Sequence, residues 1–169
     1  MTIRARTWPN GIPSTSAPRY SRKPGPPADR CAAERVVARV LLDTGPLVAL
    51  FKRNDAWHRR AAGWFSRNRA DLVTTHAVLT EAWHLISPPA RGKLMAFAAA
   101  ALIVPELAED AIPRLTRLLA TYADTPMDYA DATLVLLAHD LGELRVATID
   151  LGDFGVYRTE GRKALRVVF

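Results

Sequence analysis

Several classes of protein are excluded by what this sequence lacks. Its only cysteine is Cys31, so the chain can form no internal disulfide and cannot supply a cysteine-rich zinc or iron–sulfur site. No apolar run approaches the ~20 residues that a membrane-spanning helix needs, which excludes an integral membrane protein. A glycine-rich dinucleotide motif and a Walker A motif are also absent. These absences favour a reducing compartment, and we expect the protein in the cytoplasm.

The positive charge of the chain is unevenly distributed. The 169 residues carry a formal net charge of +6, a length that suits one folded domain with an appendage. Residues 1–35 hold six of the twelve prolines and seven basic residues against two acidic ones. Because this segment lacks an apolar period, we expect a disordered basic arm at 1–35 and a folded domain at 36–169. A start codon assigned too early would also explain the arm.

A second basic segment covers residues 52–69. It contains six basic residues against Asp55 alone, with Trp57 and Trp64 among them. Cations that follow phosphates and aromatic rings that stack on bases would suit RNA, although a solvated helix face and packed tryptophans explain the same pattern. The candidate RNA contacts are Arg59, Arg60, Arg67 and Arg69.

Strands alternate with helices along residues 36–169. Short apolar runs rich in β-branched residues predict strands at 36–42, 72–74, 103–104, 145–149 and 165–169. Helical periodicity and capping residues predict helices at 47–51, 55–68, 76–86, 91–102, 109–122 and 128–139. The last of these helices is apolar nearly all round, so we expect it to be central and buried. This alternation is typical of an α/β fold with a parallel sheet.

Four acidic residues occupy unusual positions. Asp43 and Asp150 directly follow predicted strands, whose carboxyl ends line the functional crevice in open α/β sheets. Glu81 and Asp131 lie on apolar faces of predicted helices, where an unpaired charge is costly. Structural roles stay open for three of them. Asp43 and Asp150 could bond turn amides, and Asp131 is spaced as the third residue after a capping Asp128.

A cation would reconcile these carboxylates with one another. Four acids at one crevice repel one another and raise one another's pKa unless a cation neutralises them. An all-oxygen site suits Mg²⁺, or Mn²⁺, rather than zinc. Such an ion activates water and stabilises charge on a phosphoryl group. Beside an arginine-rich surface, the acids predict hydrolysis of a phosphodiester.

Four spaced motifs carry a resemblance to a known family. In order they are VLLDTGPLVALF at 40–51, TTHAVLTEAWHLI at 74–86, MDYADATLVLLAHDLG at 127–142 and ATIDLGDFGVYR at 147–158. Together they resemble the PIN-domain ribonucleases, and most closely the VapC-type toxins of bacterial toxin–antitoxin pairs. The resemblance implies a three-layer α/β/α PIN-like domain with a central parallel sheet, and it leaves the arm outside.

The resemblance also implies roles for individual residues in a Mg²⁺-dependent endoribonuclease. Asp43 and Asp131 would be the principal metal ligands, with Glu81 and Asp150 completing an acidic catalytic pocket. The accessory positions are Asp153, Thr44 and Thr148, of which the two threonines can orient an acid. We expect in-line attack of water on an RNA phosphate, which leaves 5′-phosphate and 3′-hydroxyl ends. The partners implied are the RNA substrate, a cognate antitoxin protein and a second copy in a homodimer.

Three other functions are compatible with parts of this pattern. A phosphatase of the haloacid-dehalogenase type wants a second aspartate two residues after Asp43, where this chain has Gly45. A receiver domain needs paired acids before its first helix, and none is present. A PIN-like module that binds RNA or an antitoxin without catalysis stays an open alternative.

Overall fold

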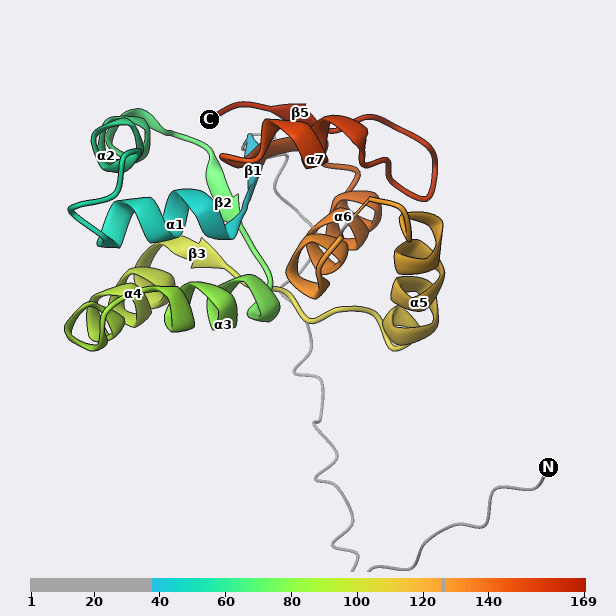
Figure 1. Ribbon diagram of the computed structural model, residues 1–169, viewed down its shortest axis with the longest axis horizontal. Helices are drawn as coiled ribbons and strands as arrows, with labels where there is room; N and C mark the ends of the chain where they lie inside the picture. Colours follow the sequence, from blue (N-terminus) through green and yellow to red (C-terminus); the bar gives the residue numbers. More distant parts are fainter. Residues whose placement is uncertain (1–37, 126) are drawn as a thin grey trace, which may run out of the picture. The chain divides into compact units, whose positions relative to one another are not determined.

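The computed structural model describes residues 38–125 and 127–169, and the predicted arm at 1–35 lies outside the described residues (Figure 1). Five strands form one sheet in the order β3-β2-β1-β4-β5, and every neighbouring pair is parallel. The strands are β1 (Arg39–Leu42), β2 (Asp71–Val73), β3 (Leu102–Ile103), β4 (Arg145–Ala147) and β5 (Arg166–Val167). The predicted parallel α/β sheet is therefore confirmed.

Helices cover the sheet and complete a three-layer α/β/α architecture. They are α1 (Thr44–Phe51), α2 (His58–Arg67), α3 (His76–Leu85), α4 (Pro88–Ala101), α5 (Ala111–Thr121), α6 (Tyr129–Leu141) and α7 (Leu151–Val156). In Figure 1, α1, α2 and α4 lie to the left of β1, and α5 and α6 lie to the right. None of the described helices is long and apolar enough to span a membrane.

The strand order places a crevice between β1 and β4. From β1 the chain builds β2 and β3 on one side, and it then returns to add β4 and β5 on the other side. Leu42 pairs with Ala147 at the ends of these two strands, and the Asp43 amide donates to the Ala147 carbonyl at 3.0 Å. This point, where the strand order reverses, is where open α/β sheets form their binding crevice.

Helix α6 is the buried central helix that the sequence predicts. Its residues from Ala132 to Ala138 are all buried, and α6 contacts both α3 and α5. The helix begins at an Asp128 cap, whose Oδ1 accepts from the Asp131 amide at 2.8 Å. It ends at Gly142, whose φ of 63° lies in the left-handed region that suits glycine. The first turn of this buried helix therefore has a fixed position.

Several predicted boundaries were wrong, and for two of them local side chains supply the reason. Asp55 accepts a hydrogen bond from the Trp57 amide in a turn, so α2 begins at His58 instead of directly after Asp55. Pro88 and Pro89 form the first turn of α4, where proline needs no amide donor. The helix predicted from residue 91 therefore begins three residues earlier.

The short helix α7 was missed by the sequence-based prediction. Asp150 caps this helix, with its Oδ1 accepting from the Asp153 amide at 2.9 Å. Gly152 and Gly155 within six residues give the segment the composition of a turn. Strand β4 also ends at Ala147, two residues before the predicted end. Thr148 and Asp150 therefore lie outside the sheet, in the connection between β4 and α7.

Candidate active site

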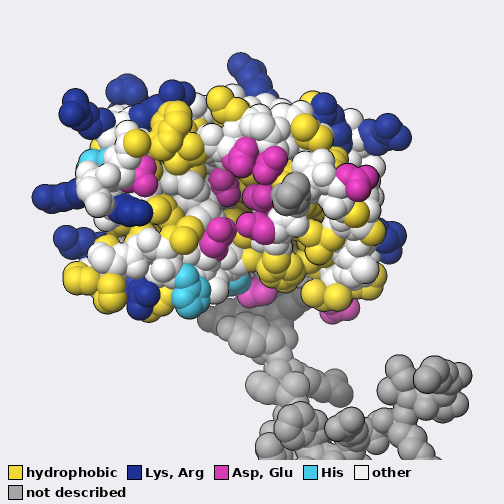
Figure 2. Space-filling model, viewed as in Figure 1, with side chains coloured by type: hydrophobic (Ala, Val, Ile, Leu, Met, Phe, Trp, Pro, Cys, Tyr) yellow, Lys and Arg dark blue, Asp and Glu magenta, His cyan; other side chains and the backbone are white. Residues whose placement is uncertain are grey.

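The four predicted site carboxylates lie in one cleft of about 550 Å³ at the carboxyl ends of β1 and β4. Figure 2 shows acidic side chains gathered at the centre of this face, with lysines and arginines around its rim. No lysine, arginine or histidine is among the described residues that line the cleft. Its acidic lining consists of Asp43, Asp55, Glu81, Asp128, Asp131, Asp150 and Asp153.

Asp43 is held at the junction of β1 and α1. It caps α1, with Oδ1 accepting from the Thr44 amide at 2.6 Å, while Oδ2 accepts from the Thr148 hydroxyl at 2.7 Å. The side chain is buried, and this burial raises its pKa from 3.8 to about 6 although both hydrogen bonds favour the ionised form. Asp43 therefore has both roles: it bonds a turn amide, which the sequence left open, and it lines the acidic cleft.

Thr148 connects the carboxylate of Asp43 to the backbone of Asp150. Its hydroxyl donates to Asp43 and accepts from the amide of Asp150 at 2.9 Å. The threonine is 1% exposed, so solvent cannot replace either partner. This buried hydroxyl fixes the orientation of Asp43 and the path of the chain into α7.

Glu81 reaches the cleft from α3. Its Oε2 accepts a hydrogen bond from the Thr44 hydroxyl at 2.7 Å, and the side chain is half-buried. Thr44 and Thr148 thus each donate to an acid, which is the geometry that the family resemblance implies for them. The sequence placed Glu81 on an apolar stripe with Val78 and Leu85, and here it was partly wrong. Val78 is buried, whereas Leu85 is 54% exposed and lines the cleft.

The pKa of Asp131 is raised further than that of Asp43. Asp131 lies in the first turn of α6, and its pKa is raised from 3.8 to about 8. Burial is the largest cause, and repulsion from the charges of Asp128 and Asp43 adds to it. The Tyr157 hydroxyl donates to its Oδ2 at 3.3 Å, which offsets only part of this shift. Without a cation, this raised pKa favours the protonated form of Asp131 at neutral pH.

Two lining residues of the cleft and one residue that contacts Asp131 were not predicted from the sequence as site residues. Asp128 was interpreted only as a helix cap, yet its charge acts directly on Asp131. Asp55 lines the cleft from the turn before α2. Tyr157 follows α7 and meets Asp131 through tertiary packing, so no local pattern identifies it. The spacing of Asp128 three residues before Asp131 was the one signal present in the sequence.

The cleft fits a divalent cation by the chemistry of its donors. Its carboxylates and the Thr44 hydroxyl offer oxygen ligands, and none of the described lining residues has a positive side chain to neutralise the acids. Among the described residues, no three His, Cys, Asp or Glu side chains are already arranged to hold one ion. Mg²⁺ does not need such a cage, because proteins usually bind it through one or two carboxylates and retained waters.

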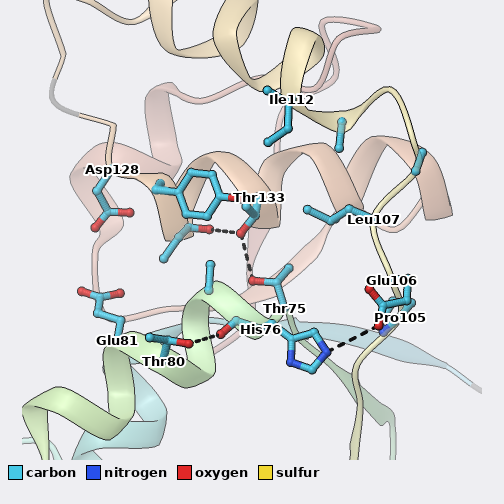
Figure 3. Close-up of a pocket in the computed structure, with 15 residues that line it drawn as sticks. Thr75, His76, Thr80, Glu81, Pro105, Glu106, Leu107, Ile112, Asp128 and Thr133 are labelled. Atoms are coloured by element: carbon cyan, nitrogen blue, oxygen red, sulfur yellow. Dashed lines mark hydrogen bonds and ion pairs between the residues drawn. The ribbon is translucent and has the colours of Figure 1, made fainter. Parts of the chain in front are cut away.

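A larger groove of about 760 Å³ adjoins the cleft and shares Glu81 and Asp128 with it (Figure 3). Its wall includes Leu107 and Ile112, and His76 lies 3.9 Å from Glu106 at one end. Among the described residues that line this groove there is no lysine and no arginine. The two neighbouring hollows therefore differ, because the cleft is acidic and the groove is largely apolar.

The arginines of α2 lie outside the cleft lining. Arg60 donates to the carbonyl of Phe169 at 2.7 Å, with its guanidinium 5.5 Å from the Phe169 ring. Trp64 donates from Nε1 to the Val168 carbonyl at 2.8 Å, and its ring packs on Phe169. Arg69 donates to carbonyls at the end of α2. Part of this basic surface thus holds the C-terminal segment, and the predicted RNA contacts stay a prediction.

Comparison with known proteins identifies the family. The profile of the PIN domain matches residues 40–154, which include all four predicted site carboxylates. The chain belongs to the PIN domain family. No curated protein sequence matches it. Among solved structures, the PIN domain described here is similar to the Mycobacterium tuberculosis toxin VapC20, described as cleaving the sarcin–ricin loop. The identity is 20% and the TM-score 0.62, over 67% of this chain and 91% of that chain.

Proposed function

We propose that this PIN domain is a metal-dependent endoribonuclease that acts as the toxin of a type II toxin–antitoxin system. One observation carries the proposal: the described residues that line the cleft where the strand order reverses include seven carboxylates and no positive side chain. The pKa values of Asp43 and Asp131 are raised there, and perturbed pKa values cluster at functional sites. The family membership and the similarity to a toxin structure support the same function.

Mg²⁺, or Mn²⁺ in its place, is the cofactor that we propose. Asp43 and Asp131 would hold it, with Glu81 and Asp150 contributing directly or through water. When bound, the ion would stabilise charge on a phosphoryl group and lower the pKa of water. The proposed products are RNA fragments with 5′-phosphate and 3′-hydroxyl ends.

The surrounding residues prepare these carboxylates for an ion. Thr148 and the Thr44 amide hold the two oxygens of Asp43 in fixed directions. The Thr44 hydroxyl orients Glu81, and Asp153 lies in the first turn of α7 behind its Asp150 cap. These contacts keep the acids facing one space, so that little reorganisation is needed when a cation and a phosphate enter.

Cleavage of a single-stranded RNA by the purified protein tests the proposal. We expect cleavage with Mg²⁺ and none with EDTA. Asp43→Asn should lower the rate on the order of 100-fold or more, because it removes several kcal/mol of stabilisation from the transition state. Asp124→Asn is the matched control, since Asp124 is exposed and outside the cleft lining, and it should cleave at the wild-type rate.

Two outcomes would contradict parts of the proposal. Undiminished cleavage by Asp43→Asn would place the nuclease site elsewhere. Mg²⁺ binding by a folded protein that cleaves no RNA would favour the alternative of a catalytically inactive module. The proposed antitoxin and homodimer are tested by co-expression with the product of a short neighbouring gene and by measuring the mass of the isolated complex.

A further inference from the structure

We propose that the RNA backbone leaves the acidic cleft past Leu85 and enters a cationic pocket formed by Lys52, Arg53 and Lys93. This pocket measures about 470 Å³ and shares Leu85 with the cleft lining. It lies between the turn after α1 and the start of α4. The inference rests on the proposed function, and it adds the direction in which the substrate runs and the side chains that hold it.

The three cations of this pocket are available to a ligand. Lys52, Arg53 and Lys93 are exposed, and none of them makes a salt bridge or a side-chain hydrogen bond with a described residue. The pocket lining contains no aspartate and no glutamate among the described residues. Three uncompensated positive charges around one hollow attract an anion, and the phosphates of RNA supply a row of them.

Two other hollows fit the same strand less well, one because of its charge and the other because of its position. Among the described residues that line the neighbouring groove, Glu81, Glu106 and Asp128 are acidic and none is a lysine or an arginine, so this charge disfavours a phosphate there. A third hollow of about 410 Å³ is lined by four arginines and Glu160, so its charge suits a phosphate. However, none of the described residues that line it also lines the cleft.

The positions of the two sites match the needs of an RNA strand. The scissile phosphate would lie at the carboxylates, where a bound metal would compensate their charge, and its neighbours along the strand would need cations of their own. Leu85 is the shared wall between the two spaces, and its exposed side chain offers an apolar surface to a ribose or a base. The acidic cleft would therefore hold the reacting phosphate, and the cationic pocket would bind the phosphates next to it along the strand.

Binding of a fluorescein-labelled twelve-residue polyuridylate, measured by anisotropy, tests this inference. All proteins carry Asp131→Asn and are studied in Mg²⁺, so that binding is measured without the proposed cleavage. We expect the variant Lys52→Ala/Arg53→Ala/Lys93→Ala to bind about tenfold more weakly at low salt. Its slope of log Kd against log salt should fall by about 2, because each phosphate contact on a single strand contributes about 0.7.

A matched control separates a local site from a general loss of charge. Arg117→Ala/Lys163→Ala/Arg166→Ala removes three exposed cations that do not line the acidic cleft. This control should change the Kd less than threefold, and Lys52→Arg/Lys93→Arg should bind as the parent does. The residues 1–35 are the same in every protein, so their charge cancels from the comparison.

The outcomes distinguish this inference from the proposed function. If the pocket variant binds as tightly as its parent, or no more weakly than the control, the inference is wrong. That result leaves the proposed function standing when the protein without Asp131→Asn cleaves RNA in Mg²⁺. Conversely, weaker binding by the pocket variant together with a wild-type protein that cleaves nothing would support the RNA site and contradict the nuclease.

Discussion

Thr148 and Asp43 link the carboxyl ends of the two strands between which the strand order reverses, with Thr148 Oγ1 donating to Asp43 Oδ2 at 2.7 Å. The two residues lie 105 positions apart in the chain, and both are buried. A single hydroxyl therefore ties the geometry of the acidic cleft to the pairing of β1 with β4.

Thr148→Val should weaken the proposed metal site without unfolding the domain. The change keeps the size of the side chain but removes the donor to Asp43, and a supporting hydrogen bond of this kind is worth about 10- to 100-fold in metal affinity or activity. Without this donor the pKa of Asp43 rises further above about 6, so the pH at which activity is half-maximal should also rise. A pH–rate profile measures both effects. Thr148→Ser keeps the donor and should retain the wild-type profile, and equal profiles for all three proteins would contradict this role.

The stability of the metal-free protein should fall as pH rises from about 4 to about 8. Asp43 and Asp131 have pKa values of about 6 and about 8 in the folded protein against 3.8 ordinarily, so the folded state binds more protons than the unfolded chain over this range. When the folded state binds more protons, raising the pH lowers the free energy of unfolding. Urea denaturation in EDTA at several pH values measures this dependence.

Asp131→Asn provides the control for that pH dependence. It removes the carboxylate with the higher pKa, so the fall in unfolding free energy toward pH 8 should become shallower than in the wild type. Mg²⁺ at pH 8 should restore stability to the wild type and much less to the variant, because ligand binding stabilises only the folded form that binds it. A slope identical in both proteins would contradict the account.

Arg114 should be a main contributor to stability away from the cleft. Its side chain is only 11% exposed and pairs with Asp140 at 2.6 Å and with Glu160 at 2.7 Å, holding the pKa of Glu160 below its usual range. Arg114→Ala should lower the free energy of unfolding by about 1–3 kcal/mol, because it leaves charged partners without their donor. Arg117→Ala on the same helix is exposed and should cost under about 0.5 kcal/mol. Urea denaturation of both variants at pH 7 distinguishes the two positions, and equal losses would contradict the role of Arg114.

Trp64 should act on folding more than on RNA. Its indole donates to the Val168 carbonyl and packs on the rings of Phe65 and Phe169. Trp64→Ala should destabilise the domain by about 3–5 kcal/mol, the usual cost of truncating a packed tryptophan. Trp64→Phe, which keeps most of the ring contacts, should lose less. If instead Trp64→Ala kept full stability while RNA binding fell, the tryptophan would be a base-stacking residue as the sequence pattern also allowed.

Much of the fold and the candidate cleft could be predicted because the signals are local. Asp43 directly follows β1, and Asp150 follows the end of β4 by three residues. Glu81 and Asp131 stand among apolar residues in the sequences of their helices. Tyr157 could not be found this way, because its contact with Asp131 depends on how α7 and its following turn pack against α6. The pattern of arginines and tryptophans was ambiguous for a similar reason. Side-chain type does not reveal that the C-terminal Phe169 occupies that face of α2.

Mapping of RNA 5′ ends after brief expression is the most direct test of whether this protein cleaves RNA. Wild type, Asp131→Ala and the exposed control Asp124→Asn would be compared at equal levels of folded protein. We expect discrete new 5′-phosphate ends with the wild type and the control, and none with Asp131→Ala. The same new ends in Asp131→Ala, or no new ends in any of the three, would contradict this expectation.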